Sequence, residues 1–351
     1  MQNKQDKKRV IITGVTGQDG SYLAELLLSK GYEVHGLRRR STVENTKNLS
    51  KIDLQPNTRN NFHLHYGDVL DSSNLSHLIS DIKPHEFYNL AAQSHVHLSF
   101  KIPEYTTEVN SIAVLKMLEI LKSKSINTKF YQASTSEMFG DLQTNKIISE
   151  KTNFNPCSPY ANSKLFSHNL IKDYRSRGIY AVSGILFNHE SPRRSSNFVT
   201  MKIIDGAIKL KFNLIKCLYL GNIYSYRDWG YAPDYVDAMW RMINKKTKTK
   251  DFIIATGKSY MVKEFINKVF NSLGCKLSWT GRGLKEEAID SKTNKVLIKI
   301  DPYYFRPNEV RYLKGSSYKA EKELSWKPMH QLNFLIKDMI NSRLEELGLT
   351  L

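Results

Sequence analysis

The chain has 351 residues, of which 40% are hydrophobic and 11% aromatic, so it can bury a core large enough for an α/β domain with a smaller lobe. No run of about 18 apolar residues occurs, which excludes a membrane-spanning helix, and the polar, lysine-rich start is untypical of a signal peptide. The formal net charge of +18 favours an anionic partner, either nucleic acid or a phosphate-bearing small molecule. Because the lysines are scattered, solvated surface explains most of the excess, and we expect no nucleic-acid partner.

The cysteine pattern indicates a reducing environment. Cys157, Cys217 and Cys275 are odd in number and far apart, and no Cys-x-x-Cys motif occurs. Neither a disulfide framework nor a zinc site is predicted from them, and we expect a cytoplasmic protein without a bound metal.

The first half of the chain alternates apolar runs of strand length with helical patterns. The expected strands are Arg9–Thr13, Glu33–Leu37, Phe62–Tyr66, Phe87–Leu90 and Lys129–Ser134. Helices are expected over 18–30 and 108–122, the second with Val109, Ile112, Leu115 and Leu118 on one face. This alternation predicts a parallel sheet with helices on both sides. The polar segment 38–61 is long for a connection, and long ordered loops are often functional.

The second half is less regular and is interrupted by prolines at 192, 233, 302, 307 and 328. We interpret residues 1–185 as the core of a nucleotide-binding domain. Residues 186–351 are expected to form mainly a smaller substrate-binding lobe, from which segments at about 220–260 return to the sheet. The predicted fold class is therefore α/β, a doubly wound parallel sheet of Rossmann type with an interleaved C-terminal lobe.

A glycine-rich turn follows the first expected strand and opens the first helix. Gly14 permits a tight turn, Gly17 allows backbone to approach a pyrophosphate at the helix N-terminus, and Gly20 allows helix and strand to pack closely. The motif in this position predicts dinucleotide binding rather than a merely structural turn. The second strand runs into Arg38-Arg39-Arg40-Ser41 where an NAD site carries an acidic residue, which favours NADP over NAD; the alternative is a solvated basic turn.

Tyr160 and Lys164 lie one helical turn apart, so both side chains are expected on one helix face. An ammonium group near a tyrosine lowers the pKa of its hydroxyl, which would let Tyr160 act as a base. Upstream, Ser134 to Glu137 end an apolar strand, where open parallel sheets place their chemistry. The alternative for Glu137 is an ordinary loop carboxylate. A second Tyr-x-x-x-Lys pair, Tyr318 and Lys322, lacks this context and is expected on the surface.

Together these residues resemble the extended short-chain dehydrogenase/reductase superfamily, and in finer detail its GDP-mannose 4,6-dehydratase family. The matching segments keep the family's order along the chain. They are TGVTGQDGSYLAE (13–25), AAQSHV (91–96), STSEMFG (134–140), SPYANSKL (158–165), ILFNHESPRR (185–194), NFVTMKI (197–203), RDWGYAPDYVDAMW (227–240) and YFRPNEV (304–310). The segments around NHESPRR and RDWG are specific, whereas the glycine motif alone is not.

The resemblance implies a role for each matching position. It implies catalysis by Thr135, Glu137 and Tyr160, supported by Lys164. It implies contacts to NADP from Gly14, Thr16, Gly17, Gln18, Asp19, Gly20, Arg39, Arg40, Ser41, Asp68, Val69, Leu90, Ala91, Ala92, Gln93, Ser94, Tyr105, Lys164, His189 and Arg194. It implies contacts to a GDP-sugar from Ser94, Asn188, Lys202, Arg227, Arg306 and Glu309. It also implies a homodimer or homotetramer.

The implied reaction is an internal redox cycle. Tyr160 removes the proton from the 4-hydroxyl as hydride leaves C4, and the resulting ketone acidifies the C5 proton for Glu137. Water leaves from C6 and the hydride returns there, giving a 4-keto-6-deoxy sugar with no net use of cofactor.

Several positions depart from the family and leave the sugar open. They are His97, Cys157, Ser195-Ser196, Met201 and Ile223 to Tyr226. Another GDP-sugar, such as a GDP-linked heptose, is therefore an alternative substrate. A sugar-nucleotide 4-epimerase or reductase needs no base at C5, so Glu137 disfavours it. A non-catalytic NADP-binding protein that binds RNA would not need Tyr160, Lys164 or Glu137.

Overall fold

The computed structural model describes residues 7–42, 45–53, 60–124, 127–142, 146–245, 250–305 and 308–350. Seven parallel strands form the central sheet, in the order β11-β6-β5-β4-β1-β2-β3. Their bounds are β1 Arg9–Thr13, β2 Glu33–Arg38, β3 Phe62–Tyr66, β4 Glu86–Asn89, β5 Lys129–Thr135, β6 Ala181–Leu186 and β11 Phe252–Ile254. The apolar runs form the central strands because both faces of the sheet are covered. The predicted α/β fold class with a parallel sheet is confirmed.

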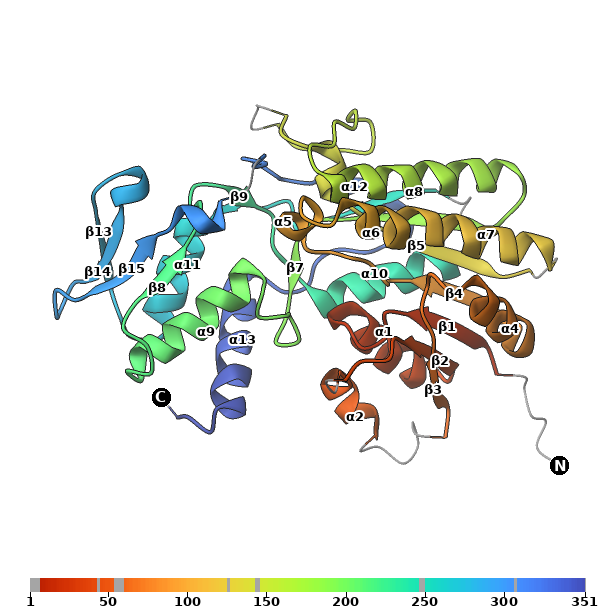
Figure 1. Ribbon diagram of the computed structural model, residues 1–351, viewed down its shortest axis with the longest axis horizontal. Coiled ribbons are helices and arrows are strands. Elements are labelled where there is room, and N and C mark those ends of the chain that lie inside the picture. The colour runs from red at the N-terminus through yellow and green to blue at the C-terminus, as the bar shows by residue number, and fades with distance from the viewer. Residues whose placement is uncertain are drawn as a thin grey trace.

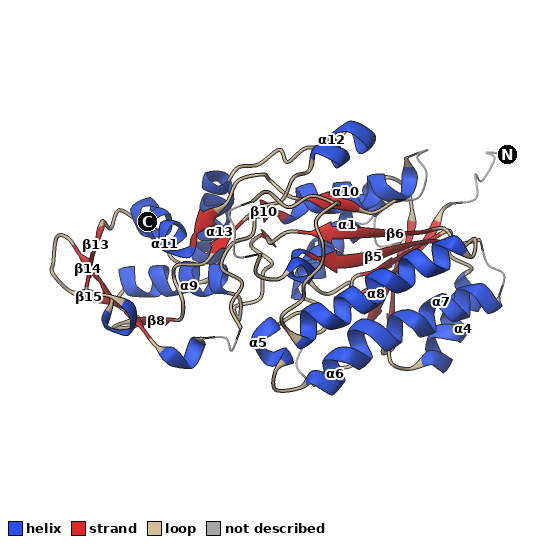
Figure 2. Ribbon diagram, turned by 90° about the horizontal axis from the view of Figure 1, so that it is seen from above, coloured by secondary structure: helices blue, strands red, loops and turns tan. Residues whose placement is uncertain are grey.

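Helices cover both faces of this sheet (Figure 2). One face carries α1 (Gln18–Ser29), α10 (Ala232–Asn244) and α12 (Tyr318–Leu324), and the other carries α4 (Ser72–Ile82), α7 (Ala113–Ser123) and α8 (Pro159–Ser176). Each face has its own apolar core. Because β11, α10 and α12 come from the second half of the chain, the sheet is completed only after the chain has left it and returned.

The helix expected over 108–122 differs from the prediction at its start. It follows α6 (Pro103–Thr107) through a π-helical turn, Glu108–Ile112, before α7 begins. Val109 and Leu118 are buried in one core and Leu115 packs against it, as a shared face predicts, whereas Ile112 is half-buried and is not part of that core. The wider turn shifts the helix face, because each π turn holds more residues than an α turn.

A smaller lobe lies beside the sheet and carries the C-terminus (Figure 1). Its four-stranded sheet has the order β13-β14-β15-β8. The strands are β8 Leu218–Leu220, β13 Leu277–Thr280, β14 Glu287–Asp290 and β15 Val296–Ile300, and the helices are α9 Val199–Lys211, α11 Val262–Ser272 and α13 Leu332–Glu346. Two short pairs join the lobes: β7 (His189–Glu190) with β10 (Gly230–Tyr231), and β9 (Tyr226–Arg227) with β12 (Tyr260–Met261).

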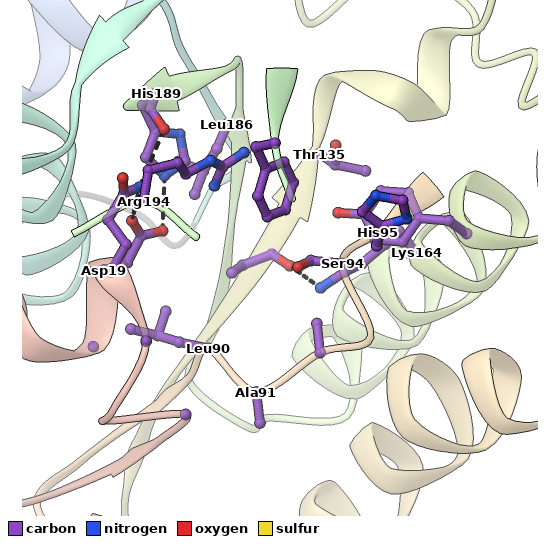
Figure 3. A pocket seen from close by; sticks show the side chains of 18 of the residues that line it. Asp19, Leu90, Ala91, Ser94, His95, Thr135, Lys164, Leu186, His189 and Arg194 are labelled. Carbon is purple, nitrogen blue, oxygen red and sulfur yellow. Dashed lines mark hydrogen bonds and ion pairs between the residues drawn. The ribbon is translucent and has the colours of Figure 1, made fainter. Parts of the chain in front are cut away.

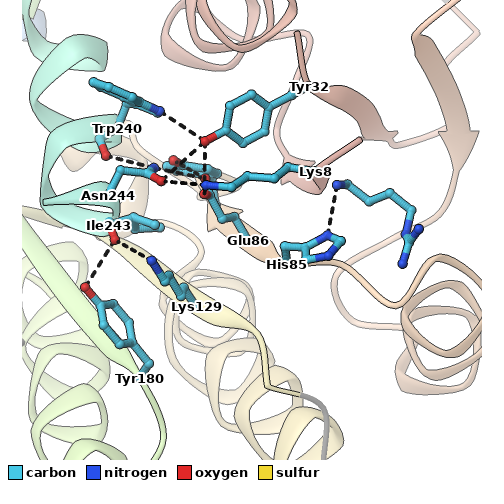
Figure 4. A network of polar contacts seen from close by, with 11 residues as sticks. Lys8, Tyr32, His85, Glu86, Lys129, Tyr180, Trp240, Ile243 and Asn244 are labelled. Carbon is cyan, nitrogen blue, oxygen red and sulfur yellow. Dashed lines mark hydrogen bonds and ion pairs between the residues drawn. The ribbon is translucent and has the colours of Figure 1, made fainter. Parts of the chain in front are cut away.

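A buried carboxylate organises the amino end of the central sheet (Figure 4). Glu86 is 1% exposed and accepts hydrogen bonds from the hydroxyls of Tyr32 (3.1 Å) and Tyr88 (2.9 Å) and the amide of Asn244 (3.3 Å). Lys8 lies 3.7 Å away as its charge partner. These contacts satisfy a charge that would otherwise be costly to bury, and they fix α10 to the sheet. None of the helices in the described ranges combines the length and apolarity that a bilayer crossing requires.

Candidate active site

A cavity of about 510 Å³ opens at the carboxyl ends of the central strands, where an open α/β sheet binds its ligands (Figure 3). Most of the predicted site residues line it. They are Gly14, Thr16, Gly17, Gln18, Asp19, Gly20, Arg39, Asp68, Val69, Leu90, Ala91, Ala92, Ser94, Tyr105, Thr135, Glu137, Tyr160, Lys164, Asn188, His189, Arg194 and Arg227. Segments from both halves of the chain therefore meet in one space.

The glycine turn between β1 and α1 leaves no room for side chains. Gly14 has φ +67°, and a Cβ there would lie 2.9 Å from the backbone nitrogen of Ala91. A Cβ on Gly20 would lie 2.3 Å from the carbonyl oxygen of Gly14 and 2.6 Å from the Cα of Val15. Helix α1 therefore approaches the turn closely, with its N-terminus directed at the cavity, as a pyrophosphate site requires.

The polar segment after β2 contacts this turn. The side-chain amide of Asn48 donates to the carbonyl oxygen of Thr16 (3.0 Å), and Asn45 lines the cavity. Within the segment, 310 helix Lys47–Leu49 continues into α2 (Ser50–Asp53). Polar side chains of the segment 38–61 thus hold this segment against the cavity. Residues 43–44 and 54–59 of the segment lie outside the described residues.

An acid–imidazole pair connects α1 to β7. The Nε2 atom of His189 lies 2.7 Å from Oδ2 of Asp19, and its Nδ1 atom lies 2.7 Å from the carbonyl oxygen of Phe187 (Figure 3). Burial alone would raise the pKa of Asp19, but His189 outweighs it and the pKa falls below its usual value. Burial opposes the charge on His189 too, yet Asp19 holds the pKa of His189 above its usual value. The pair is therefore an ion pair near neutral pH.

The three consecutive arginines that start at the last residue of β2 differ in whether they line the cavity. Arg39 lines the cavity and donates from Nη1 to the hydroxyl of Tyr105 at 2.7 Å. Arg38 also lines it, with its guanidinium stacked 4.3 Å from the ring of Tyr66. Arg40 is exposed, and neither it nor Ser41 is among the described residues that line the cavity.

The candidate catalytic side chains lie on β5, on the 310 turn after it (Ser136–Phe139) and on α8. Thr135, Glu137 and Tyr160 are each 8% exposed, and Lys164 is 3% exposed. The hydroxyl of Ser158 caps α8 by accepting from the backbone N–H of Ala161 (3.1 Å), which fixes the first turn that carries Tyr160. The strand end and the helix start thus converge on one polar centre.

The effect expected of Lys164 on Tyr160 is not found. Burial raises the pKa of Tyr160 to about 12, against the lowering effect of a hydrogen bond from Thr135, and Glu137 raises it further. Lys164 instead donates to the carbonyl oxygen of Ala133 at 2.9 Å, and burial lowers its own pKa to about 8. The expected lowering was wrong because low-dielectric surroundings disfavour the phenolate more than the neighbouring groups of the chain favour it.

The predicted GDP-sugar contacts lie toward the smaller lobe. Nη2 of Arg227 pairs with Oε1 of Glu309 at 2.8 Å, and the Oδ1 atom of Asn188 is buried without a hydrogen-bond partner among the described residues. Lys202 lies 3.1 Å from the ring centre of Tyr304, and burial lowers its pKa to about 8. Arg306 lies outside the described residues. Lys202 and Glu309 do not line the described cavity themselves.

The match to known proteins covers nearly the whole chain. Residues 11–339 match the family described as GDP-mannose 4,6 dehydratase. The GDP-mannose 4,6-dehydratase of Vibrio cholerae serotype O1 is 46% identical over 97% of this chain and 95% of its own, and that of Homo sapiens is 44% identical over 95% and 91%. This chain belongs to the GDP-mannose 4,6-dehydratase family. The resemblance read from the sequence motifs is confirmed.

Solved structures share the fold at lower identity. DesIV from Streptomyces venezuelae, a dTDP-glucose 4,6-dehydratase solved with NAD and TYD bound, gives a TM-score of 0.80 at 20% identity, covering 97% of this chain and 98% of that chain. RMD from Pseudomonas aeruginosa, complexed with NADPH, gives 0.74 at 20% identity, covering 97% and 100%. The whole two-lobed arrangement therefore recurs in these structures.

The cavity also contains side chains that sequence reasoning missed. Phe198 stacks under the guanidinium of Arg194 at 3.5 Å, and Glu190 pairs with Nε of Arg194 at 2.9 Å. His95 and Trp229 complete the walls. Each of these residues lies next to or inside a motif of this dehydratase family, so their positions were visible. The sequence alone does not say which residues of a motif line the cavity, because that depends on contacts formed in the folded protein.

Proposed function

We propose that this protein converts GDP-mannose to GDP-4-keto-6-deoxymannose and water, with NADP as its resident cofactor. The observation that carries the proposal is the position of Glu137. A nearly buried carboxylate faces the same cavity as Thr135 and Tyr160, beside the phosphate-binding turn. Hydride transfer alone would need no such base, whereas elimination of water requires one at C5.

The preference for NADP rests on Arg39. The charge-assisted hydrogen bonds of a guanidinium suit the 2′-phosphate, and the bond to Tyr105 holds this one at the cavity. Arg38, stacked on Tyr66, supplies a second positive charge at the same strand end. NADP, when bound, accepts a hydride from C4 of the sugar and later returns it to C6.

The side chains act in sequence on the sugar. Tyr160, hydrogen-bonded to Thr135, takes the proton of the 4-hydroxyl as C4 becomes a ketone. Glu137 then takes the acidified C5 proton and would pass it to the C6 hydroxyl, which departs as water. Return of the hydride to C6 and of the proton held by Tyr160 to C5 would complete the product, so both protons and the hydride are accounted for without a second reductant. Lys164, which donates to the carbonyl oxygen of Ala133 and lines the same cavity, is proposed to supply positive charge to the bound sugar and cofactor.

The GDP moiety is proposed to bind toward the smaller lobe. Arg227, buried and oriented by Glu309, suits a phosphate or ribose oxygen. The unpartnered oxygen of Asn188 suits a donor from the substrate, because a buried acceptor is costly without one. Lys202 and Arg306 are proposed to add positive charge around the diphosphate.

A second candidate is the dehydratase of a different GDP-sugar. The departures at Cys157 and Met201 favour it, because Met201 is 5% exposed on α9 and replaces an arginine common in the family. Cys157 is half-buried near Glu137. Burial raises the pKa of the Cys157 thiol, and the negative charge of Glu137 raises it further. Neither residue lines the described cavity, so we propose that they change its shape through their neighbours and admit a sugar with a different substituent.

The experiment is incubation of the purified protein and NADP with a panel of GDP-sugars and UDP-sugars. A GDP-sugar should lose one water, detected by mass spectrometry, with no net accumulation of NADPH. Turnover of UDP-sugars and of no GDP-sugar would contradict the proposal. We also propose a cytoplasmic homodimer or homotetramer, in which the 38–61 segment approaches a neighbouring subunit; light scattering that finds an active monomer would refute that assembly.

A further inference from the structure

A cluster of imidazoles lies on the neighbouring strands β2 and β3, and none of them is among the described residues that line the cavity. Glu33 and His35 alternate along β2, and His63 and His65 alternate along β3. His35 and His63 are direct partners in the parallel register, so the two-residue period places all four side chains on one face. Strand β3 is an outer strand of the sheet (Figure 1), and His63 on it is 43% exposed.

The geometry points to a site for a divalent transition metal, most suitably Zn²⁺, held by the Oε1 atom of Glu33 and the Nε2 atoms of His35 and His63. We propose this site, which goes beyond the dehydration reaction. Both Nε2 atoms lie 3.3 Å from Oε1 of Glu33, and the three atoms lie within 4.8 Å of one another. Tetrahedral zinc with bonds near 2.0–2.1 Å separates its ligand atoms by roughly 3.3 Å.

The state of His35 supports a ligand role over a packing role. His35 is 8% exposed, and its buried Nε2 atom makes no well-directed hydrogen bond among the described residues, although Oε1 of Glu33 lies 3.3 Å away. A buried polar atom without a partner is costly, and a metal ion would satisfy it. Its other ring nitrogen, Nδ1, lies 3.0 Å from Nε2 of His65. This contact orients the imidazole of His35, which is what the outer partner of a metal-bound imidazole does.

His63 provides the accessible side of this site. The rings of His35 and His63 stack with centroids 4.8 Å apart, and His63 is 43% exposed, so it can turn toward an ion and leave a fourth position for water.

The test uses the full chain without a polyhistidine tag, stripped with chelator and then supplied with ZnCl₂. Metal analysis after gel filtration should find about one zinc per chain, and Co²⁺ in its place should give the intense visible absorption of tetrahedral coordination. His63→Ala and Glu33→Gln should abolish stoichiometric binding. His65→Ala should weaken it by roughly 10–100-fold.

His77→Ala is the matched control, because His77 is exposed on α4 outside the cluster and should leave zinc binding unchanged. Zinc should also raise the thermal midpoint of the wild type and not that of His63→Ala, since it would link β2 to β3. Absence of binding to the wild type, or binding that survives in both His63→Ala and Glu33→Gln, would overturn the proposal. Turnover of GDP-sugars is read separately and should be the same in all these variants, so failure of the dehydratase assignment would not be confused with failure of this site.

Discussion

Replacement of Glu137 by glutamine separates the two chemical steps that the cavity is built to perform. The carboxylate is 8% exposed in the 310 turn after β5, and its backbone N–H is held by the hydroxyl of Thr135 at 3.2 Å. Glutamine keeps the size and polarity of this side chain, so the turn should persist. Because the negative charge of Glu137 raises the pKa of Tyr160, its removal should make deprotonation of Tyr160 easier and leave oxidation at C4 intact.

The expected result is therefore loss of elimination without loss of oxidation. Product formation should fall by roughly 10²–10⁴-fold, or about 3–5 kcal/mol in the barrier, which is the usual contribution of a positioned acid–base group. Enzyme-bound NADPH should accumulate during single turnover and be visible by its absorbance. Tyr160→Phe should block the earlier step and give no NADPH signal. Exchange of solvent deuterium into C5 should disappear in Glu137→Gln.

Glu104→Gln, at an exposed position on α6, is the matched control and should turn over at the wild-type rate. Near wild-type turnover by Glu137→Gln would refute the reasoning and make Glu137 an ordinary turn carboxylate. Another group of the cavity would then have to take the C5 proton.

Three further perturbations test the site. Arg39→Ala should weaken binding of NADP much more than binding of NAD, whereas Arg40→Ala, outside the cavity lining, should change neither greatly; titration with each cofactor measures this. Gly20→Ala should abolish cofactor binding and lower the free energy of unfolding by about 1–3 kcal/mol, measured with urea, since its Cβ would meet backbone at 2.3 Å. Asp19→Asn should cost about 2 kcal/mol, less than a fully buried pair because Asp19 is 21% exposed. Because folding raises the pKa of His189, the stabilisation that His189 contributes is complete below pH 6.5 and is lost as pH rises through its pKa in the folded protein. Because folding lowers the pKa of Asp19, the stabilisation that Asp19 contributes is present above pH 3.8 and is lost at still lower pH. The difference from wild type should therefore be largest between those limits, and an effect that does not vary with pH would contradict the ion pair.

The fold could be predicted largely from local pattern. The strand runs and the glycine turn are signals contained in short segments, and the structure gives β1 and β3 the predicted bounds. The expected helix face was wrong at Ile112, which lies in the π turn; that turn packs against α8 and has no comparable signal in the sequence. The sequence could not predict the pKa of Tyr160 for the same reason. Burial raises this pKa, and the burial of Tyr160 depends on segments that are far away in the chain.

The π turn also explains a motif residue that does not line the cavity. Gln93 is buried; its backbone N–H donates to Oδ1 of Asn110 (2.9 Å) and its side chain donates to Thr106 (3.0 Å). Asn110, inside the π turn, donates to the hydroxyl of Ser163 at 3.1 Å, and Ser111 donates to the carbonyl oxygen of that same residue at 2.9 Å. Ser163 lies in α8 between the two side chains proposed to handle the sugar hydroxyl. A regular α turn would direct successive side chains differently, so the wider turn lets two adjacent polar residues reach α8 together. The loop after β4 and the start of α8 are thus held in one buried hydrogen-bonded chain, of which Gln93 is a member, while Gln93 is not among the described residues that line the cavity.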